Sequence, residues 1–323
     1  MTRVAVIGAR CRHQGIGEFV ARWFSEAGAT VCAIIGTRRE TNATTVATLE
    51  ERYGIRCNAY TDTAACLTAE EPDIVAICSP FEYHREHLEV VAAHGSHCLC
   101  EKPFWWEEAE DRRQETARLV DAFIARDRYV GVLTQWPLTL PSFYDLHPQV
   151  KSEPVERFEF RLSPSRRGEL MIPDAAPHVL SMVYALVGTG ELREPTATFE
   201  DVEGTDLRLQ FLYEPTAHTD ELGVERPQDV VQVTCRFQTQ ERPPRAAWYA
   251  INGHKVDRTI DMARYDMYFE SHERRVRIED PLKLLVQDFL AKVNRGAVVD
   301  REALVQGIGD LELLSSTVAS IVE

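Results

Sequence analysis

The chain has 323 residues, of which 44% are apolar and 27% charged, and its formal net charge is −15. This length allows two domains, and the composition is that of a globular protein rather than a disordered one. The strong negative charge argues against non-specific binding to nucleic acid or to an anionic membrane surface, so we expect neither among its partners.

The first half of the chain alternates strands and helices. An apolar strand over 2–8 leads to a helix that begins near Gly17 and stops at Gly28, and a second strand covers 30–35. Helices are expected at 46–53 and 84–94, and further strands at 74–78 and 98–100. Strands that alternate with helices of this length predict a doubly wound α/β fold, in which a parallel sheet is covered by helices on both faces.

Glycines surround the first strand-to-helix turn. Glycine lets the backbone approach a pyrophosphate, and the helix N-terminus supplies unpaired N–H groups. The usual G-x-G-x-x-G spacing is replaced by a longer loop whose Arg10, Arg12 and His13 offer positive charge to a phosphate. A glycine-rich turn without a ligand is the alternative. The cofactor-binding residues expected here are Gly8, Ala9, Arg10, Gly15, Ile16 and Gly17.

Thr37, Arg38 and Arg39 follow the second strand. An NAD-specific site usually places Asp or Glu at this strand end, where the carboxylate holds the ribose 2′-hydroxyl. A hydroxyl and two guanidinium groups suit a 2′-phosphate instead, and Glu40 lies too late in the turn. The sequence therefore predicts that NADP(H) is preferred over NAD(H); a solvated basic turn is the alternative.

Glu101-Lys102-Pro103 follows an apolar strand directly. Burial disfavours an ammonium ion, so a lysine at such a place is costly unless it is used, and proton transfer is a suitable use. Pro103 fixes the backbone where the strand ends. A solvated lysine in a turn is the alternative.

Together these segments resemble the glucose–fructose oxidoreductase/inositol dehydrogenase family, written Gfo/Idh/MocA. The resemblance rests on segment 73–80, His84, segment 93–95 and segment 100–103. It implies that Lys102 faces the substrate beside the nicotinamide. It also implies cofactor contacts at Ser79, Pro80, His84, Glu101 and Lys102.

A second segment, 168–178, resembles the family's Asp-x-x-x-His sequence at the start of a helix. The spacing places Asp174 and His178 on one helix face, one turn apart. Histidine titrates near neutrality and can pass a proton to or from a hydroxyl or carbonyl oxygen, while the aspartate orients it or binds substrate. The alternative is that Asp174 caps the helix and His178 is a packed helix residue.

Apolar and polar residues alternate after about residue 153, which predicts a largely antiparallel sheet with one face covered by the helix over 174–187. Two helices finish the chain, with Asp300 as the N-cap of the last. Surface loops are expected at 215–227 and 238–244. The expected strands cover 158–162, 207–213, 231–237, 246–251, 256–260, 265–269 and 274–278.

We therefore expect a dinucleotide-binding Rossmann-type domain over 1–135 and an α+β domain over 136–323 for substrate binding and oligomerisation. The last helix is expected to return to the first domain. Family members often associate through the open face of this sheet, which implies a homodimer or homotetramer.

The predicted activity is hydride transfer between NADP(H) and the hydroxyl, carbonyl or imine carbon of a sugar-like or cyclitol-like molecule. Lys102 or His178 is the expected proton-transfer group. A nucleotide-binding sensor without turnover and a non-redox lyase or hydrolase are the alternatives. Gln135 and Trp136 are candidate pocket residues without an assigned role. Segment 166–167, with its two arginines, is either a binding site for a carboxylate or phosphate or a solvated basic turn.

Eight cysteines are scattered without a CxxC pair, several of them within apolar segments. Such residues are typical of small buried side chains in a reducing compartment. Cys98 and Cys100 are close, but no neighbouring His/Cys set completes a site, so no metal is expected. Residues 1–8 read as a strand rather than as a secretion leader, and no apolar run approaches about 20 residues. We expect a cytoplasmic protein without a membrane span.

Overall fold

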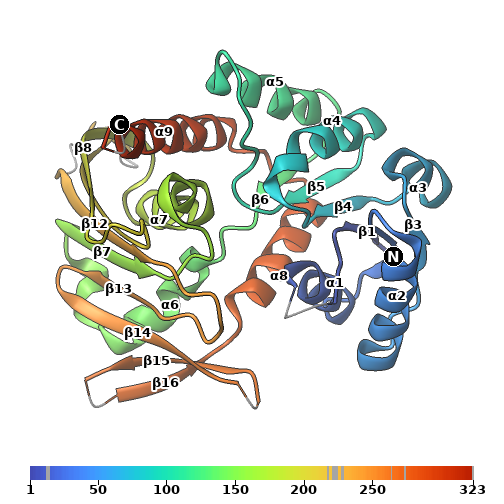
Figure 1. The fold of residues 1–323 in the computed structure, drawn as a ribbon, viewed down its shortest axis with the longest axis horizontal. Coiled ribbons are helices and arrows are strands. Elements are labelled where there is room, and N and C mark those ends of the chain that lie inside the picture. The colour runs from blue at the N-terminus through green and yellow to red at the C-terminus, as the bar shows by residue number, and fades with distance from the viewer. Residues whose placement is uncertain are drawn as a thin grey trace. The chain divides into compact units, whose positions relative to one another are not determined.

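The computed structural model describes residues 1–11, 15–216, 218–219, 225–226, 229–262, 264–272 and 274–321. The chain forms two compact units, the first from residues 1–134 and 282–305 and the second from residues 135–281 and 306–323. Each unit has its own sheet, and the elements of both are labelled in Figure 1. Arg12 and His13 of the predicted phosphate loop lie outside the described residues.

The first unit contains a six-stranded sheet in which every neighbouring pair is parallel. The strand order is β3-β2-β1-β4-β5-β6. The chain adds successive strands on one side of β1 and then, from β4 onward, on its other side. Ligands of such sheets bind outside the carboxyl ends of the strands at this reversal. The predicted doubly wound fold is therefore confirmed. The strands are β1 (Arg3–Ile7), β2 (Thr30–Ile35), β3 (Asn58–Tyr60), β4 (Ile74–Ile77), β5 (His97–Cys100) and β6 (Val130–Val132).

The helices of this unit contribute its apolar contacts. Helix α1 buries Val20, Trp23 and Phe24. Phe289 of α8 packs edge-on against Phe24, with ring centres 6.4 Å apart, and against Tyr129 at 5.5 Å. The helices are α1 (Ile16–Glu26), α2 (Arg39–Tyr53), α3 (Thr63–Glu70), α4 (His84–His94), α5 (Arg112–Ile124) and α8 (Pro281–Asn294), with a 3-10 turn η1 (Phe81–Tyr83).

The second unit is built on an eight-stranded sheet of order β16-β15-β14-β13-β7-β12-β9-β8. Only β7 and β12 are parallel neighbours among the described strands, so the predicted, mainly antiparallel sheet is confirmed. The strands are β7 (Arg157–Leu162), β8 (Gly190–Phe199), β9 (Asp206–Pro215), β12 (Val231–Gln238), β13 (Ala247–Ile251), β14 (His254–Asp261), β15 (Asp266–Ser271) and β16 (Arg274–Ile278).

Two strand features differ from the sequence expectation. β8 was not predicted, because its residues do not alternate and its pairing with β9 is shifted between Arg193 and Thr196. The segment 215–227, predicted as a loop, includes a two-stranded ribbon of β10 (His218–Thr219) and β11 (Glu225–Arg226).

Helix α7 (Met171–Val187) packs on β7 and β12 of this sheet (Figure 1). The same covered face holds an aromatic cluster in which Tyr249 contacts Phe158, Phe160 and Phe269. The remaining elements are η2 (Trp136–Thr139), α6 (Leu140–Leu146), η3 (Pro148–Ser152), η4 (Gly168–Leu170) and α9 (Arg301–Ala319). Asp300 caps α9 as predicted, accepting the Ala303 N–H at 3.0 Å.

The segment Gly168–Val187 is long and apolar enough, by composition alone, to cross a membrane, which corrects the expectation that no such run exists. This is weak evidence for a span, because half of the window is buried within the fold and a core helix passes the same test. Its buried residues include Met171, Val179 and Met182. Packing on the sheet therefore accounts for the apolar composition of this helix.

Candidate active site

The turn between β1 and α1 leaves no room for side chains at two of its glycines. Gly8 has φ +83°, and a Cβ there would lie 2.7 Å from the carbonyl carbon of Cys78. A Cβ on Gly17 would lie 2.6 Å from the carbonyl oxygen of Gly8. The turn is thus pressed against the end of β4, as a dinucleotide-binding turn requires. Ala9 is buried beside it.

The N-terminus of α1 opens at this turn. Gly15 is the N-cap and Ile16 the first helical residue, and no side chain caps the helix among the residues described. Arg10 is exposed, and its backbone N–H donates to the Gly8 carbonyl at 2.8 Å. Gly8 and Gly17, with the turn between them, are called the glycine cradle below. Uncapped N–H groups beside this cradle fit a pyrophosphate. Glu18, which sequence reasoning missed, is buried and accepts hydrogen bonds from Arg52 and Tyr53, each at 2.9 Å.

The end of β2 presents exposed basic residues. Thr37, Arg38 and Arg39 are all exposed, and neither arginine has a carboxylate within ion-pair distance in the described part of the chain. The buried Asn42 holds this strand end, because its side-chain amide donates to the carbonyls of Gly36 at 3.0 Å and Tyr60 at 2.7 Å. No sequence motif indicated Asn42.

His84 joins the two turns that carry the family resemblance. Its Nε2 lies 2.9 Å from the Ser79 carbonyl, its Nδ1 lies 2.9 Å from the Pro103 carbonyl, and its ring is fully buried. Burial lowers the pKa of His84, so the neutral ring donates to one of these carbonyls at a time. The His84 side chain thus supports the Ser79 and Pro103 turns, and the implied cofactor contact at His84 stays a prediction.

Ser79 and Pro80 follow β4 at the same sheet edge. The Ser79 hydroxyl is buried and has no hydrogen-bond partner among the residues that the structure describes. A buried hydroxyl without a partner is costly and indicates a group that bonds to something else. Together with the Gly8 and Gly17 cradle, this atom fits the nicotinamide cofactor that the resemblance implies.

Lys102 and Glu101 follow β5 and are partly exposed. Pro103, Phe104 and Trp105 after them are buried, and the Trp105 indole N–H donates to the Thr116 hydroxyl at 2.8 Å. The chain that follows Lys102 is thus fixed to α5.

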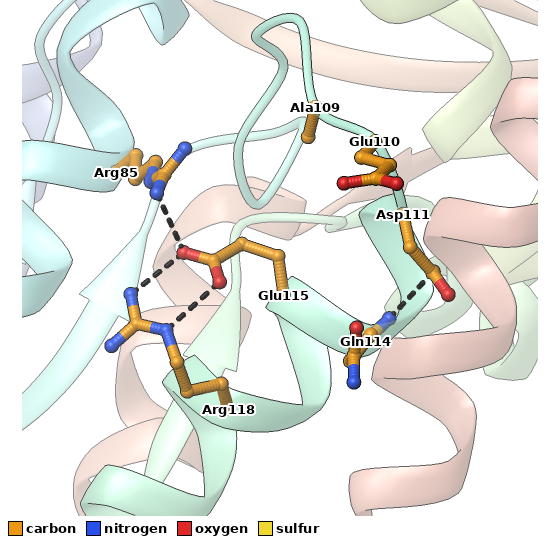
Figure 2. Close-up of a pocket in the computed structure, with 7 residues that line it drawn as sticks. All are labelled: Arg85, Ala109, Glu110, Asp111, Gln114, Glu115 and Arg118. Atoms are coloured by element: carbon orange, nitrogen blue, oxygen red, sulfur yellow. Dashed lines mark hydrogen bonds and ion pairs between the residues drawn. The ribbon is translucent and has the colours of Figure 1, made fainter.

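A polar surface hollow of about 460 Å³ lies beside this segment (Figure 2). Glu115 forms ion pairs with Arg85 at 2.9 Å and Arg118 at 2.6 Å, and Asp111 caps α5 through the Gln114 N–H at 2.8 Å. The Arg85 guanidinium also lies 5.7 Å from the Trp105 ring centre. Because Glu115 occupies both arginines, we assign this hollow a structural role in holding the 103–111 segment.

Asp174 and His178 lie in the second unit, one turn apart on α7, and both are partly exposed. The Asp174 carboxylate accepts the backbone N–H groups of Ser165 at 3.0 Å and Arg166 at 3.4 Å. Leu170, not Asp174, is the N-cap of the helix. Asp174 therefore fixes the loop after β7.

Trp136 is buried and packs edge-on against Phe160, with ring centres 4.9 Å apart. Of the two arginines suggested for anion binding, Arg167 lies 3.4 Å from Glu241. Arg258, which sequence reasoning did not select, lies 5.2 Å from the Trp136 ring centre. Within the described ranges no group of three His, Cys, Asp or Glu side chains is arranged to hold a metal ion.

Residues 2–130 match the oxidoreductase family with an NAD-binding Rossmann fold, GFO_IDH_MocA. The first domain of the chain is therefore similar to that family, in agreement with the sequence resemblance. The D-glucoside 3-dehydrogenase of Escherichia coli (strain K12) is 36% identical over 80 residues, which cover 24% of this chain and 22% of that relative.

Two solved structures share the fold over nearly the whole chain. UDP-N-acetylglucosamine 3-dehydrogenase from Acidithiobacillus ferrooxidans has a TM-score of 0.69 and 19% identity, covering 100% of this chain and 99% of that one. Biliverdin reductase from Synechocystis sp. PCC 6803, in complex with biliverdin and NADP+, has a TM-score of 0.63 and 14% identity, covering 98% of each chain.

Proposed function

We propose that this protein is an NADP(H)-dependent oxidoreductase that acts on a sugar-like or cyclitol-like substrate. The observation that carries the proposal is the glycine cradle after β1, with Ser79 after β4 and Lys102 after β5. These strands are parallel, so their carboxyl ends lie at one edge of the sheet. The family match and the dehydrogenase relative support the same class.

The residues of the cradle would hold the cofactor. Gly8, Gly17 and the uncapped start of α1 suit the pyrophosphate, and the partnerless hydroxyl of Ser79 suits the nicotinamide half. When bound, the nicotinamide supplies the centre that accepts or gives a hydride. The protein's own contribution is to position the substrate and to move a proton.

The proton-transfer group in this proposal is Lys102 or His178. Either side chain can take a proton from a substrate hydroxyl as it is oxidised, or return one to a carbonyl oxygen in reduction. Both are partly exposed and thus open to a ligand. Asp174 is engaged with the backbone of Ser165 and Arg166, which supports a role in shaping the loop beside His178.

The preference for NADP(H) is supported by the exposed Arg38 and Arg39, which have no carboxylate partner among the described residues. Two such cations and the Thr37 hydroxyl suit a 2′-phosphate. The family description names NAD, and one structural neighbour was solved with NADP+. Dissociation constants for NADPH and NADH test the preference directly, and equal or tighter NADH binding would overturn it.

We further propose a cytoplasmic homodimer or homotetramer that associates through the sheet of the second unit. All eight cysteines are free thiols, which supports a reducing compartment. Arg208, Gln210 and Arg236 alternate with the buried residues of β9 and β12, so they line the opposite sheet face. Light scattering at several protein concentrations measures the assembly, and a monomer at all of them would refute it.

The activity is tested by following cofactor absorbance with sugars, cyclic ketones and imines, using NADP+ or NADPH as required. Turnover on any of these classes supports the oxidoreductase. Tight cofactor binding without turnover on all of them would favour the nucleotide-binding sensor. Cofactor retained through purification, with substrate consumed but no net redox change, would favour the lyase or hydrolase.

A further inference from the structure

Arg258 lies on the covered face of the eight-stranded sheet. In the register of β14 it is opposite Ala247 of β13 and Phe269 of β15, both of which are buried. Directly opposed residues of neighbouring strands point to the same face. The guanidinium therefore shares its face with apolar and aromatic side chains, where an unpaired charge is costly.

The protein satisfies few of the five N–H groups of Arg258. Nη2 donates to the Arg245 carbonyl at 2.7 Å, and the guanidinium carbon lies 5.2 Å from the Trp136 ring centre. Nε is buried and has no hydrogen-bond partner within the described ranges. No carboxylate in the described part of the chain lies within ion-pair distance of this side chain.

Three other arginines of this sheet are paired with carboxylates. Arg236 lies 2.7 Å from Asp206, Arg275 lies 3.1 Å from Glu270, and Arg193 lies 2.7 Å from Glu214. Arg258 thus differs from these three arginines in lacking a carboxylate partner among the described residues. A counter-ion from outside the chain would supply what the fold does not.

Arg258 is charged at neutral pH despite its surroundings. Burial lowers its pKa to about 10, while Tyr265 and Asp280 act to raise the value and Arg245 acts to lower it. The side chain as a whole remains partly exposed, so a ligand can reach it. A reachable cation of this kind is suited to an anionic ligand.

The position of Arg258 connects it with the candidate site of the second unit. Ala246, next to Arg245, accepts a hydrogen bond from the Ser163 hydroxyl at 2.8 Å. Two residues further along, Ser165 donates to Asp174. Arg258 therefore lies at the same end of the sheet as the loop that Asp174 holds.

A second unsatisfied atom lies next to Trp136 in the chain. The side-chain oxygen of Gln135 is buried and accepts no hydrogen bond from the described part of the chain. Trp136 itself is fixed by edge-on packing on Phe160 and Tyr249. Trp136 is thus next to Gln135 in the chain and close to Arg258 in space, and each of these two residues carries a buried polar atom without a partner among the described residues.

We propose that Arg258, supported by Trp136 and with Gln135 as a neighbouring polar contact, binds a carboxylate or phosphate group of the substrate. A guanidinium offers parallel N–H donors that match either group. The substrate class is then an acidic sugar or a sugar phosphate rather than a neutral sugar. This inference rests on the proposed oxidoreductase function and specifies its substrate.

Binding is tested by thermal melting of the NADPH-loaded protein in malonate or inorganic phosphate, against sodium chloride of equal ionic strength. Loading with NADPH keeps these anions out of the cofactor phosphate sites. The anions should raise the melting temperature of the wild type and should not raise that of Arg258→Met. Arg275→Met is the matched control: this arginine also stacks on an aromatic ring, with its guanidinium 3.9 Å from the Tyr268 ring centre, but is ion-paired, so the anion effect should persist.

The melting temperature without anion distinguishes the anion site from a purely structural role of Arg258, in which its replacement would destabilise the fold. Removing an unpaired buried charge should leave the melting temperature of Arg258→Met without anion at or above the wild-type value. A variant that melts markedly lower and still responds fully to malonate or phosphate would overturn the proposal. Arg258→Lys keeps the positive charge but lacks the parallel N–H donors of the guanidinium, so this variant should retain a weaker anion response.

Turnover measurements test the anion site separately from the proposed oxidoreductase activity. D-glucose, D-glucuronate and D-glucose 6-phosphate should differ in kcat/KM, with one acidic sugar favoured roughly ten- to a hundred-fold over glucose. Arg258→Met should remove that ratio, and the identity of the favoured acid distinguishes carboxylate from phosphate.

The two failures are distinguishable. Equal turnover of neutral and acidic sugars by both proteins would refute the anion site and leave the oxidoreductase standing. An anion response that depends on Arg258, without turnover of any sugar, would support the site and count against the oxidoreductase.

Discussion

A Cβ atom on Gly17 would lie 2.6 Å from the carbonyl oxygen of Gly8, a separation that real Cβ atoms essentially never show. The clashing atom belongs to the backbone, which cannot move away as the end of a flexible side chain can. The first strand-to-helix turn is therefore closed by two glycines that are nine residues apart in the chain.

Gly17→Ala should lower both the stability of the protein and its affinity for the cofactor. Forcing the turn apart should cost about 1–3 kcal/mol of unfolding free energy and should weaken NADPH binding at least about tenfold. Gly307→Ala is the control, because its Cβ would be 3.8 Å from the Tyr184 ring and it lies within α9. That variant should gain up to about 1 kcal/mol. Urea titration and fluorescence titration measure the two effects, and wild-type NADPH binding by Gly17→Ala would contradict the cradle.

Lys102→Ala should reduce turnover by roughly a hundredfold or more while NADPH binding stays near the wild-type value. The reason is that the proposed role of the lysine is proton transfer rather than cofactor binding. Lys292→Ala serves as the control, because Lys292 is paired with Asp288 at 2.8 Å on α8. Steady-state rates with the best substrate of the screen provide the measurement, and unchanged turnover in Lys102→Ala would remove this residue from the mechanism.

Two substitutions of His84 should distinguish the contribution of its contact with the Ser79 turn from that of its contact with the Pro103 turn. An asparagine amide can replace Nδ1 and keep the bond to the Pro103 carbonyl, whereas a glutamine amide can replace Nε2 and keep the bond to Ser79. His84→Asn should then weaken NADPH binding more than it lowers kcat. His84→Gln should lower kcat more than it weakens binding, because Pro103 follows Lys102. Identical losses in both variants would mean that the ring acts only as packing.

Replacing Arg38 and Arg39 together by leucine should raise the dissociation constant of NADPH by roughly ten- to a hundredfold and leave that of NADH unchanged. Both arginines are exposed and without carboxylate partners in the described chain, so their loss should not unfold the protein. Arg56→Leu removes an exposed arginine that is paired with Glu50 and should change neither constant. Parallel weakening of NADPH and NADH would refute recognition of the 2′-phosphate.

His97 should make the stability of the first unit depend on pH. Its Nδ1 accepts the Tyr129 backbone N–H at 2.8 Å, and its pKa is lowered by burial and then by the Arg128 cation. The folded state therefore binds the proton less readily than the unfolded chain does. The stabilisation is complete above the unfolded value near pH 6.5 and is lost as the pH falls toward the folded value.

Urea midpoints at about pH 7.5 and about pH 5.5 measure this effect. His97→Asn keeps an acceptor for the Tyr129 N–H and removes the titration, so the difference between the two midpoints should shrink. It should not vanish, because burial also lowers the pKa of His84, His87 and His147. An unchanged difference would show that His97 does not contribute.

The local pattern of the sequence determined most elements of the fold. Helix α4 and strands β2 and β16 begin and end at the predicted residues, because apolar periodicity and flanking breakers reflect local preferences. β8 was missed, since its residues do not alternate and it is held by pairing with β9. The Gly-rich turn and the Lys102 segment could be selected as candidates from the sequence, because their proposed chemistry depends on adjacent residues.

Tertiary structure decided which side chains are engaged and which are not. The sequence selected His84 as a cofactor contact, and the structure adds that its buried ring contacts two carbonyls and supports the Ser79 and Pro103 turns. It selected Arg167, which is paired with Glu241, and it passed over Arg258, which has no counter-ion among the described residues. Pairing and burial depend on residues that are distant in the chain, so no local pattern in the sequence contains them.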